Sequence, residues 1–226
     1  KILSRDSYSA TLRAYLYAGL ISSGPWVLSI ISVMLIGVIS LGVVVPDNTV
    51  RQFLVTVTYL MASSLIYTGG AQLFFTRFIS DRLFEKKNDR ILPNLLGIML
   101  IVTLSSGVLA SLVMGFMFDE PFAYRLLVLA NFVTLCNLWL VIIFLSGMKA
   151  YNRILLVMLV GYSLMVLCAF FLRFLHMNGL LLALLIGHGS LLFMFLFDIL
   201  REYPAKQLVA FDFLQRRQVF ISLLVT

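Results

Sequence analysis

The sequence predicts an all-α integral membrane protein built as a six-helix transmembrane bundle, and three observations support this prediction. Hydrophobic residues make up 62% of the 226 residues, whereas charged residues make up only 12%. A soluble domain is typically about 45–50% apolar and about 25% charged, because polar groups must meet water. The apolar residues also gather into long uncharged runs, and the basic residues fall between those runs. This composition excludes an ordinary soluble globule.

Six uncharged runs are long enough to cross a bilayer, which takes about 20 residues of helix. Their length and uniform apolarity favour helices over barrel strands, which alternate over about 10 residues. We expect a six-helix bundle at residues 1–217 and, at 218–226, the start of a seventh helix that belongs to a C-terminal bundle. The six runs are the 33 residues between Arg13 and Asp47 and the segments 52–76, 91–118, 126–148, 154–172 and 179–197.

The distribution of Lys and Arg predicts the orientation of the bundle, because cytoplasmic loops carry the excess of these residues. Fourteen of the 17 Lys and Arg residues lie in the N-terminal segment and in every second loop after it. The other three, Arg51, Arg125 and Arg173, lie on the opposite side. We therefore expect a multi-pass membrane protein with a cytoplasmic N-terminus.

The loop after the second run is expected to continue as an amphipathic helix beyond the bilayer. Arg77 and Asp81 stand four residues apart and can pair on its surface, for a few tenths of a kcal/mol. Together with Arg82, Lys86 and Lys87 they are candidates for docking a cytoplasmic partner. Residues 198–217 also alternate charged and apolar groups, and they are expected either to lie along the membrane interface or to form a solvated linker.

The first run contains a polar interruption, Ser22-Ser23-Gly24-Pro25-Trp26. Pro25 removes a backbone donor and crowds the preceding turn, so we expect a helix kink at Gly24 and Pro25. Ser22 and Ser23 can satisfy the freed backbone groups, and Trp26 offers a flat surface on which a sugar ring can stack. The alternative is a kink that serves packing only.

Two further runs place uncharged polar residues at helical spacing. Residues on one face of a helix recur every three or four positions. Such side chains either line a cavity or form hydrogen bonds between helices, which contribute about 0.6 kcal/mol on average. The candidates are Thr56, Ser63 and Tyr67, with Gly70 beside them, and Asn131, Thr134 and Asn137.

His188 lies near the middle of the sixth run, between Gly187 and Gly189. Small neighbours allow a close helix contact, so a buried, hydrogen-bonded histidine is the default interpretation. A titrating role is the alternative. We count His188 among the candidate cavity residues.

Several classes of function are excluded or disfavoured. The net charge of +7 does not indicate nucleic-acid binding, because the basic residues sit in short loops rather than on one face. Cys136 and Cys168 lie in apolar runs and give no sign of a metal site or a disulfide. We expect no cofactor and no enzymatic activity. The runs carry no Asp, Glu, Lys or Arg at mid-depth, where ion-coupled transporters usually keep a carboxylate.

Three stretches resemble the PelG family of exopolysaccharide exporters. RAYLYAGLISSGPWVLSI at residues 13–30 resembles its N-terminal signature, and SSGPW is the most specific part. Residues 76–97 and 138–162 add further similarity in the same order. The resemblance implies a twelve-helix protein of the multidrug/oligosaccharidyl-lipid/polysaccharide exporter superfamily, in which two six-helix bundles enclose a central cavity. This chain would be the N-terminal bundle.

The same resemblance implies a partner set and a cargo. Family members pass a growing N-acetylated amino-sugar polymer across the inner membrane with a cytoplasmic glycosyltransferase and companion membrane proteins, one of which senses cyclic di-GMP. A neutral polymer needs hydroxyl, amide and aromatic partners, and the candidates above supply these. Two rivals stay open: a cation-coupled multidrug or small-molecule antiporter of the same superfamily, and a membrane scaffold that recruits the glycosyltransferase without conducting polymer.

Overall fold

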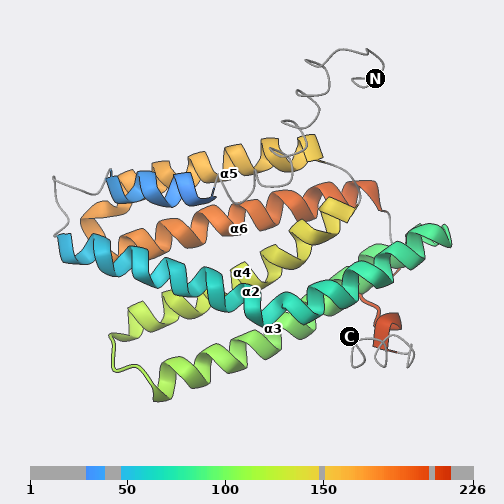
Figure 1. The fold of residues 1–226 in the computed structure, drawn as a ribbon, viewed down its shortest axis with the longest axis horizontal. Helices are drawn as coiled ribbons and strands as arrows, with labels where there is room; N and C mark the ends of the chain where they lie inside the picture. Colours follow the sequence, from blue (N-terminus) through green and yellow to red (C-terminus); the bar gives the residue numbers. More distant parts are fainter. Residues whose placement is uncertain (1–28, 39–46, 148–150, 204–206, 215–226) are drawn as a thin grey trace, which may run out of the picture.

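A computed structural model describes residues 29–38, 47–147, 151–203 and 207–214, and every regular element in these ranges is helical (Figure 1). A short helix spans Ser29–Val38. The long helices are α2 (Asp47–Phe84), α3 (Ile91–Phe116), α4 (Phe122–Gly147), α5 (Tyr151–Leu172) and α6 (His176–Glu202). Single turns of 3-10 helix lie at η1 (Asn88–Arg90), η2 (Arg173–Leu175) and η3 (Asp212–Leu214).

The all-α prediction is confirmed for the described residues, and the helices extend a few residues beyond most of the predicted runs. Four helical stretches are long and apolar enough to cross a membrane. The fourth, Ile154–Glu202, contains both α5 and α6, because the chain reverses at η2. The first predicted run lies mostly outside the described residues, as does the start of the seventh. The count of six spans and the twelve-helix architecture therefore stay predictions.

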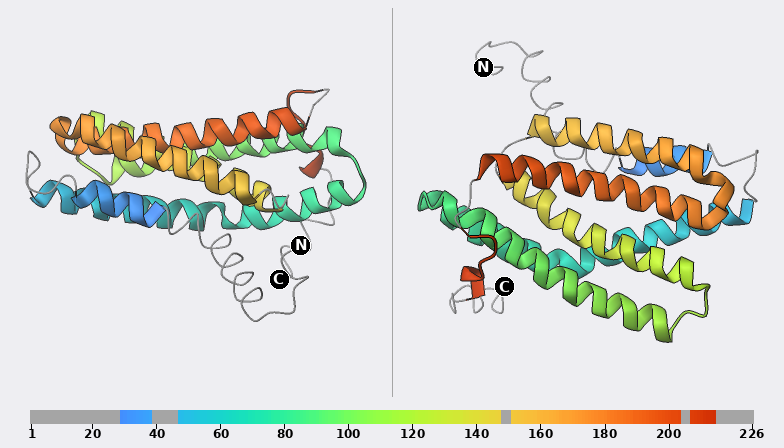
Figure 2. Two further views of the ribbon diagram at one scale, coloured as in Figure 1. Left: turned by 90° about the horizontal axis from the view of Figure 1, so that it is seen from above. Right: turned by 180° about the vertical axis from the view of Figure 1, so that it is seen from behind.

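Helix α4 occupies the centre of the structure. Buried residues make up 61% of its most apolar window, against 28–39% for the other three stretches. The helices follow the order α5, α6, α4, α3 in one layer, and α2 crosses α4 in a second layer (Figures 1 and 2). The Ser29–Val38 helix packs on α2, where Ile36 is fully buried and the Ser29 hydroxyl lies 3.7 Å from the Met61 sulfur.

Helices α5 and α6 approach closely because glycines leave room for side chains of the facing helix. A Cβ atom at Gly161 would collide with the Leu191 side chain, and one at Gly187 would collide with Met165. The tight turn between the two helices needs His176 at a positive φ of 52° and Gly179 against the Leu172 carbonyl. The expected close contact at Gly187 is therefore present, whereas the space around Gly189 is open.

A short segment after α6, which we call the strap (residues 207–214), returns beneath the α2–α3 turn. Its Phe213 ring is 3% exposed and meets Phe75 and Phe78 of α2 edge-on, at centroid distances of 6.4 and 6.2 Å. The Asp212 carboxylate accepts from Arg90 at 3.3 Å and from Asn94 of α3 at 3.2 Å. The strap thus holds the ends of two helices that otherwise contact each other little.

Replacing Gly187 by Ala is expected to lower the free energy of unfolding by about 1–3 kcal/mol, the usual cost of overpacking. The new methyl group would press on Met165 close to the α5 backbone. Gly189→Ala is the matched control, because its Cβ would meet nothing within 4 Å and alanine favours a helix. Thermal unfolding in detergent micelles measures both; equal melting temperatures for the two variants would contradict the close-packing account.

Candidate functional site

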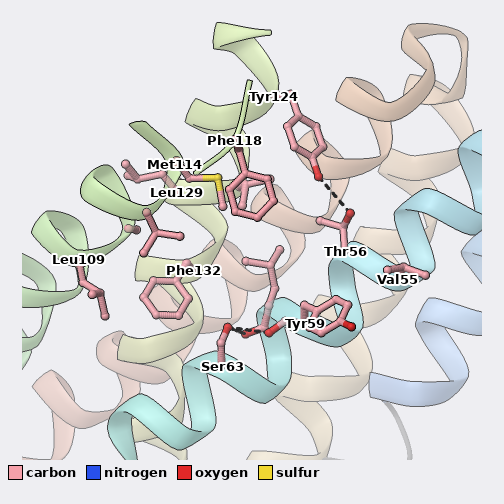
Figure 3. A pocket seen from close by; sticks show the side chains of 14 residues that line it. Val55, Thr56, Tyr59, Ser63, Leu109, Met114, Phe118, Tyr124, Leu129 and Phe132 are labelled. Carbon is pink, nitrogen blue, oxygen red and sulfur yellow. Dashed lines mark hydrogen bonds between the residues drawn. The ribbon is translucent and has the colours of Figure 1, made fainter. Parts of the chain in front are cut away.

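A cavity of about 480 Å³ lies between α2, α3 and α4, near the α3–α4 turn (Figure 3). We call it the groove. No charged side chain lines the groove. Its fourteen lining residues are Val55, Thr56, Tyr59, Leu60, Ser63, Leu109, Ala110, Val113, Met114, Phe118, Tyr124, Val128, Leu129 and Phe132.

The polar groups of the groove gather on the α2 side and at the start of α4. The Thr56 hydroxyl donates to the Gln52 carbonyl at 2.8 Å and lies 3.1 Å from the Tyr124 hydroxyl, so Tyr124 is the donor of that pair. Ser63 donates to the Tyr59 carbonyl at 2.6 Å. Both α2 hydroxyl protons are thus used within the protein, while the oxygens retain free lone pairs.

The rest of the wall is apolar. Leu109 and Met114 of α3 lie across the groove from the hydroxyls, and Phe118 and Phe132 add aromatic surface (Figure 3). The groove is therefore uncharged, as predicted for the cavity, but it is more apolar than the sequence indicated. Ligand pockets commonly combine apolar walls with a few placed polar groups.

The predicted polar face of α2 does turn toward α3 and α4. Thr56 and Ser63 line the groove. Tyr67 lies one turn further along, where its hydroxyl donates to Ser105 of α3 at 2.6 Å and its ring lies 5.9 Å from the Phe132 ring. A Cβ atom at Gly70 would meet nothing within 4 Å. Thr56, Ser63 and Tyr67 thus share one side of α2, and their role as cavity residues stays a prediction.

The polar residues Asn131 and Asn137 of α4 lie in contacts between helices rather than in the groove. The Asn131 amide donates to the Leu181 carbonyl of α6 at 3.0 Å, and the Asn137 amide donates to Thr103 of α3 at 2.9 Å. Both side chains are buried. Thr134 is half-buried and does not line the groove. These contacts favour the helix-bonding alternative over cavity lining for Asn131 and Asn137.

His188 also lies in a contact between helices, in this case α5 and α6. Its side chain is 1% exposed, its Nδ1 lies 3.0 Å from the Leu184 carbonyl, and its ring meets Tyr162 of α5 edge-on at 5.9 Å. It does not reach the groove. Within the described part of the chain, no three side chains of the metal-binding types come together.

Sequence reasoning missed two tyrosines that line the groove. Tyr59 lies three residues after Thr56 and four before Ser63, so the same helical spacing could have found it. Tyr124 precedes the predicted fourth run and was left outside it. The Trp139 indole donates to the buried Ser64 hydroxyl at 2.9 Å, which joins α4 to α2.

Two groups of predicted residues remain: the polar interruption of the first run and the docking candidates. Ser22, Ser23, Gly24, Pro25 and Trp26 lie outside the described residues, so their kink and contacts stay predictions. The docking candidates lie at the end of α2 and just after it.

At that end, the Arg82 guanidinium bonds Glu85 at 2.7 Å and lies 5.0 Å above the Phe78 ring. Lys87 also approaches Glu85, at 3.1 Å. Lys86 has a positive φ of 56°, and the bonds Lys87 N–H to Arg82 carbonyl (3.0 Å) and Lys86 N–H to Leu83 carbonyl (3.1 Å) form a Schellman cap. The turn is therefore well defined and presents Lys86 to solvent, while exposed Arg77 and half-buried Asp81 lie one turn apart on α2.

Replacing Asn131 by Leu is expected to destabilise the protein by about 0.6 kcal/mol and at most about 1.7 kcal/mol, because one interhelical hydrogen bond is lost within the bundle. Thr134→Val on the same helix is the control, since that hydroxyl joins no other described residue. Unfolding by denaturing detergent in mixed micelles measures the difference. A variant at Asn131 as stable as the Thr134 variant would show that the α4–α6 bond contributes nothing.

Comparison with known proteins gives one finding. The family model "PelG: Putative exopolysaccharide Exporter (EPS-E)" matches residues 1–226. No curated protein and no protein of solved structure matches the chain. Because the family match spans the full length and the described helices are long and apolar, this multi-pass membrane protein belongs to the PelG family of exopolysaccharide exporters.

Proposed function

We propose that this chain is the N-terminal bundle of an inner-membrane transporter that moves a growing, Pel-like N-acetylated amino-sugar polymer from the cytoplasm to the periplasm. Membership of an exopolysaccharide exporter family supports a polysaccharide as the cargo. The described helices would form one wall of the conduit, and a second bundle of six helices would form the other.

The observation that carries this proposal is the uncharged groove with hydroxyls on one wall and aromatic and aliphatic groups on the other. A sugar ring is itself two-sided: its C–H faces pack on aromatic rings, and its hydroxyls need hydrogen-bond partners. Thr56, Ser63 and Tyr124 provide oxygens, and the exposed Tyr59 ring provides a stacking face. A neutral polymer leaves no charge in the groove to compensate.

The small number of polar groups also fits a moving cargo. Conduction requires binding that is favourable enough for entry and weak enough for release. With the Thr56 and Ser63 protons already donated to backbone carbonyls, these residues offer only acceptor oxygens. Each sugar unit would therefore be held weakly and could be followed by the next.

We further propose that the inner end of α2 binds the cytoplasmic glycosyltransferase or a companion membrane protein of the synthase complex. Phe84 is 90% exposed at the helix end, and Lys86 and Lys87 follow it. Aromatic side chains are enriched in protein interfaces, and the lysines beside Phe84 would attract an acidic partner surface.

Tyr59→Ala and Ser63→Val are expected to reduce polymer export about tenfold, because a loss of about 1.4 kcal/mol in binding corresponds to that factor. Ile66→Ala is the control, because this α2 side chain is 82% exposed and does not line the groove. Secreted polymer is quantified in cells that contain equal amounts of each full-length variant. Export by both groove variants at the level of Ile66→Ala would rule the groove out as the sugar path.

The double substitution of Lys86 and Lys87 by Glu is expected to weaken capture of the cytoplasmic glycosyltransferase in pull-downs from solubilised membranes, since charge reversal opposes an acidic partner surface. The double substitution of Arg51 and Arg173 by Glu, at the other end of the bundle, controls for net charge, because both double variants lose the same charge. Normal capture together with lost export would point away from docking at this turn.

A further inference from the structure

A second, smaller hollow of about 250 Å³ lies on the other side of the α3–α4 seam, at the α3–α4 turn. We call it the turn pocket. Ser111 and Gly115 of α3 and Phe122, Arg125 and Leu126 of α4 line it. A Cβ atom at Gly115 would meet nothing within 4 Å, so the space beside this glycine is open. The pocket lies at the end of the bundle that charge patterning places away from the cytoplasm.

Arg125 brings an unsatisfied donor into this pocket. Its Nε is buried, and no hydrogen-bond acceptor reaches it in the structure. A buried donor at a charged group is costly when it has no partner. Arg173, at the same end of the bundle, is not among the residues with a buried unsatisfied donor, and its guanidinium stacks 4.3 Å from the Phe170 ring centroid. Arg125 therefore lacks an acceptor that a ligand could supply, and its planar guanidinium suits a phosphate.

Two carboxylates, Asp119 and Glu120, lie in the α3–α4 connection just before α4; they are close to Arg125 in the chain but do not belong to the lining of the turn pocket. Asp119 is exposed and Glu120 is half-buried, and among the described residues neither one forms an ion pair or hydrogen bond with the Arg125 side chain. A simple anion would be repelled by these carboxylates. A ligand that carries a phosphate and an ammonium group close together would satisfy both signs of charge at once.

The turn pocket is flanked by apolar side chains that are exposed on the outer surface of the bundle. Phe122 is 73% exposed and Leu126 is 51% exposed. In a chain that crosses a membrane, exposed apolar side chains at this level face lipid. The ligand should therefore be amphiphilic, with a zwitterionic head and hydrocarbon chains.

We propose that the turn pocket binds phosphatidylethanolamine, with its phosphate on Arg125, its ammonium group on Glu120, and its acyl chains over Phe122 and Leu126. Phosphatidylethanolamine fits better than phosphatidylglycerol, which carries no cation for the carboxylates. It also fits better than phosphatidylcholine, whose quaternary ammonium cannot donate a hydrogen bond to them. This site is separate from the proposed sugar path, so its test does not depend on export.

The test measures lipid retained by the full-length protein after reconstitution in vesicles with equal amounts of phosphatidylethanolamine, phosphatidylglycerol and phosphatidylcholine. Native mass spectrometry after gentle extraction identifies the lipid that remains bound. Wild type is expected to retain phosphatidylethanolamine preferentially, and Arg125→Gln should lose this lipid several-fold. Gly115→Leu, which fills the pocket without changing charge, should lose it as well. Arg173→Gln is the matched control and should behave as wild type.

Glu120→Gln tests the proposed contact with the ammonium group separately from the contact with the phosphate. This variant should still retain phospholipid through Arg125 but lose the preference for phosphatidylethanolamine over phosphatidylglycerol. Retention unchanged in both Arg125→Gln and Gly115→Leu would overturn the proposal. Displacement of the lipid by soluble phosphoethanolamine would also overturn it, because it would show a site for a free phosphate ester rather than for a membrane lipid.

Discussion

The bundle depends on side-chain hydrogen bonds that join the central helix α4 to α2, α3 and α6, the three helices that it contacts most. Trp139 reaches Ser64 on α2, Asn137 reaches Thr103 on α3, and Asn131 reaches the Leu181 carbonyl on α6. In lipid there is little hydrophobic drive to press apolar helices together, so packing and such bonds decide which faces meet. The three bonds fix the rotation of α4, and with it the positions of Tyr124 and Phe132 in the groove.

The sequence predicted the helices well and the roles of their polar residues less well. Gaps between charges located α3 to α6 to within a few residues, because a charge in the bilayer core is costly. The spacing of Thr56, Ser63 and Tyr67 also predicted a common face. Residues 131, 134 and 137 were treated as one stripe, yet a helix of 3.6 residues per turn rotates this stripe by about 120° over six residues. Asn131 and Asn137 therefore meet different neighbours, which no pattern within one segment reveals.

The groove and the turn pocket share a wall although they open on different sides of the α3–α4 seam. Met114 and Leu129 line both hollows. Methionine is flexible and adapts to its surroundings, so a molecule on one side of this wall alters the space on the other. The shape of the groove thus depends on what covers the α3–α4 turn, as well as on the helices that form it.

At the end of the bundle away from the α3–α4 turn, the strap holds the end of α2 and the start of α3 together. Phe213 packs on α2, and Asp212 bonds Arg90 and Asn94 at the start of α3. Moving these two helix ends apart would therefore pull the Phe213 ring out of its contacts or break the Asp212 bonds. Exposing such a ring to water costs about 1.5–3 kcal/mol. The eight residues of the strap therefore link the two helix ends through side-chain contacts. The strap's contacts resist separation of the end of α2 from the start of α3, and a force on the strap would be transmitted first to Phe75 and Phe78, whose rings contact Phe213.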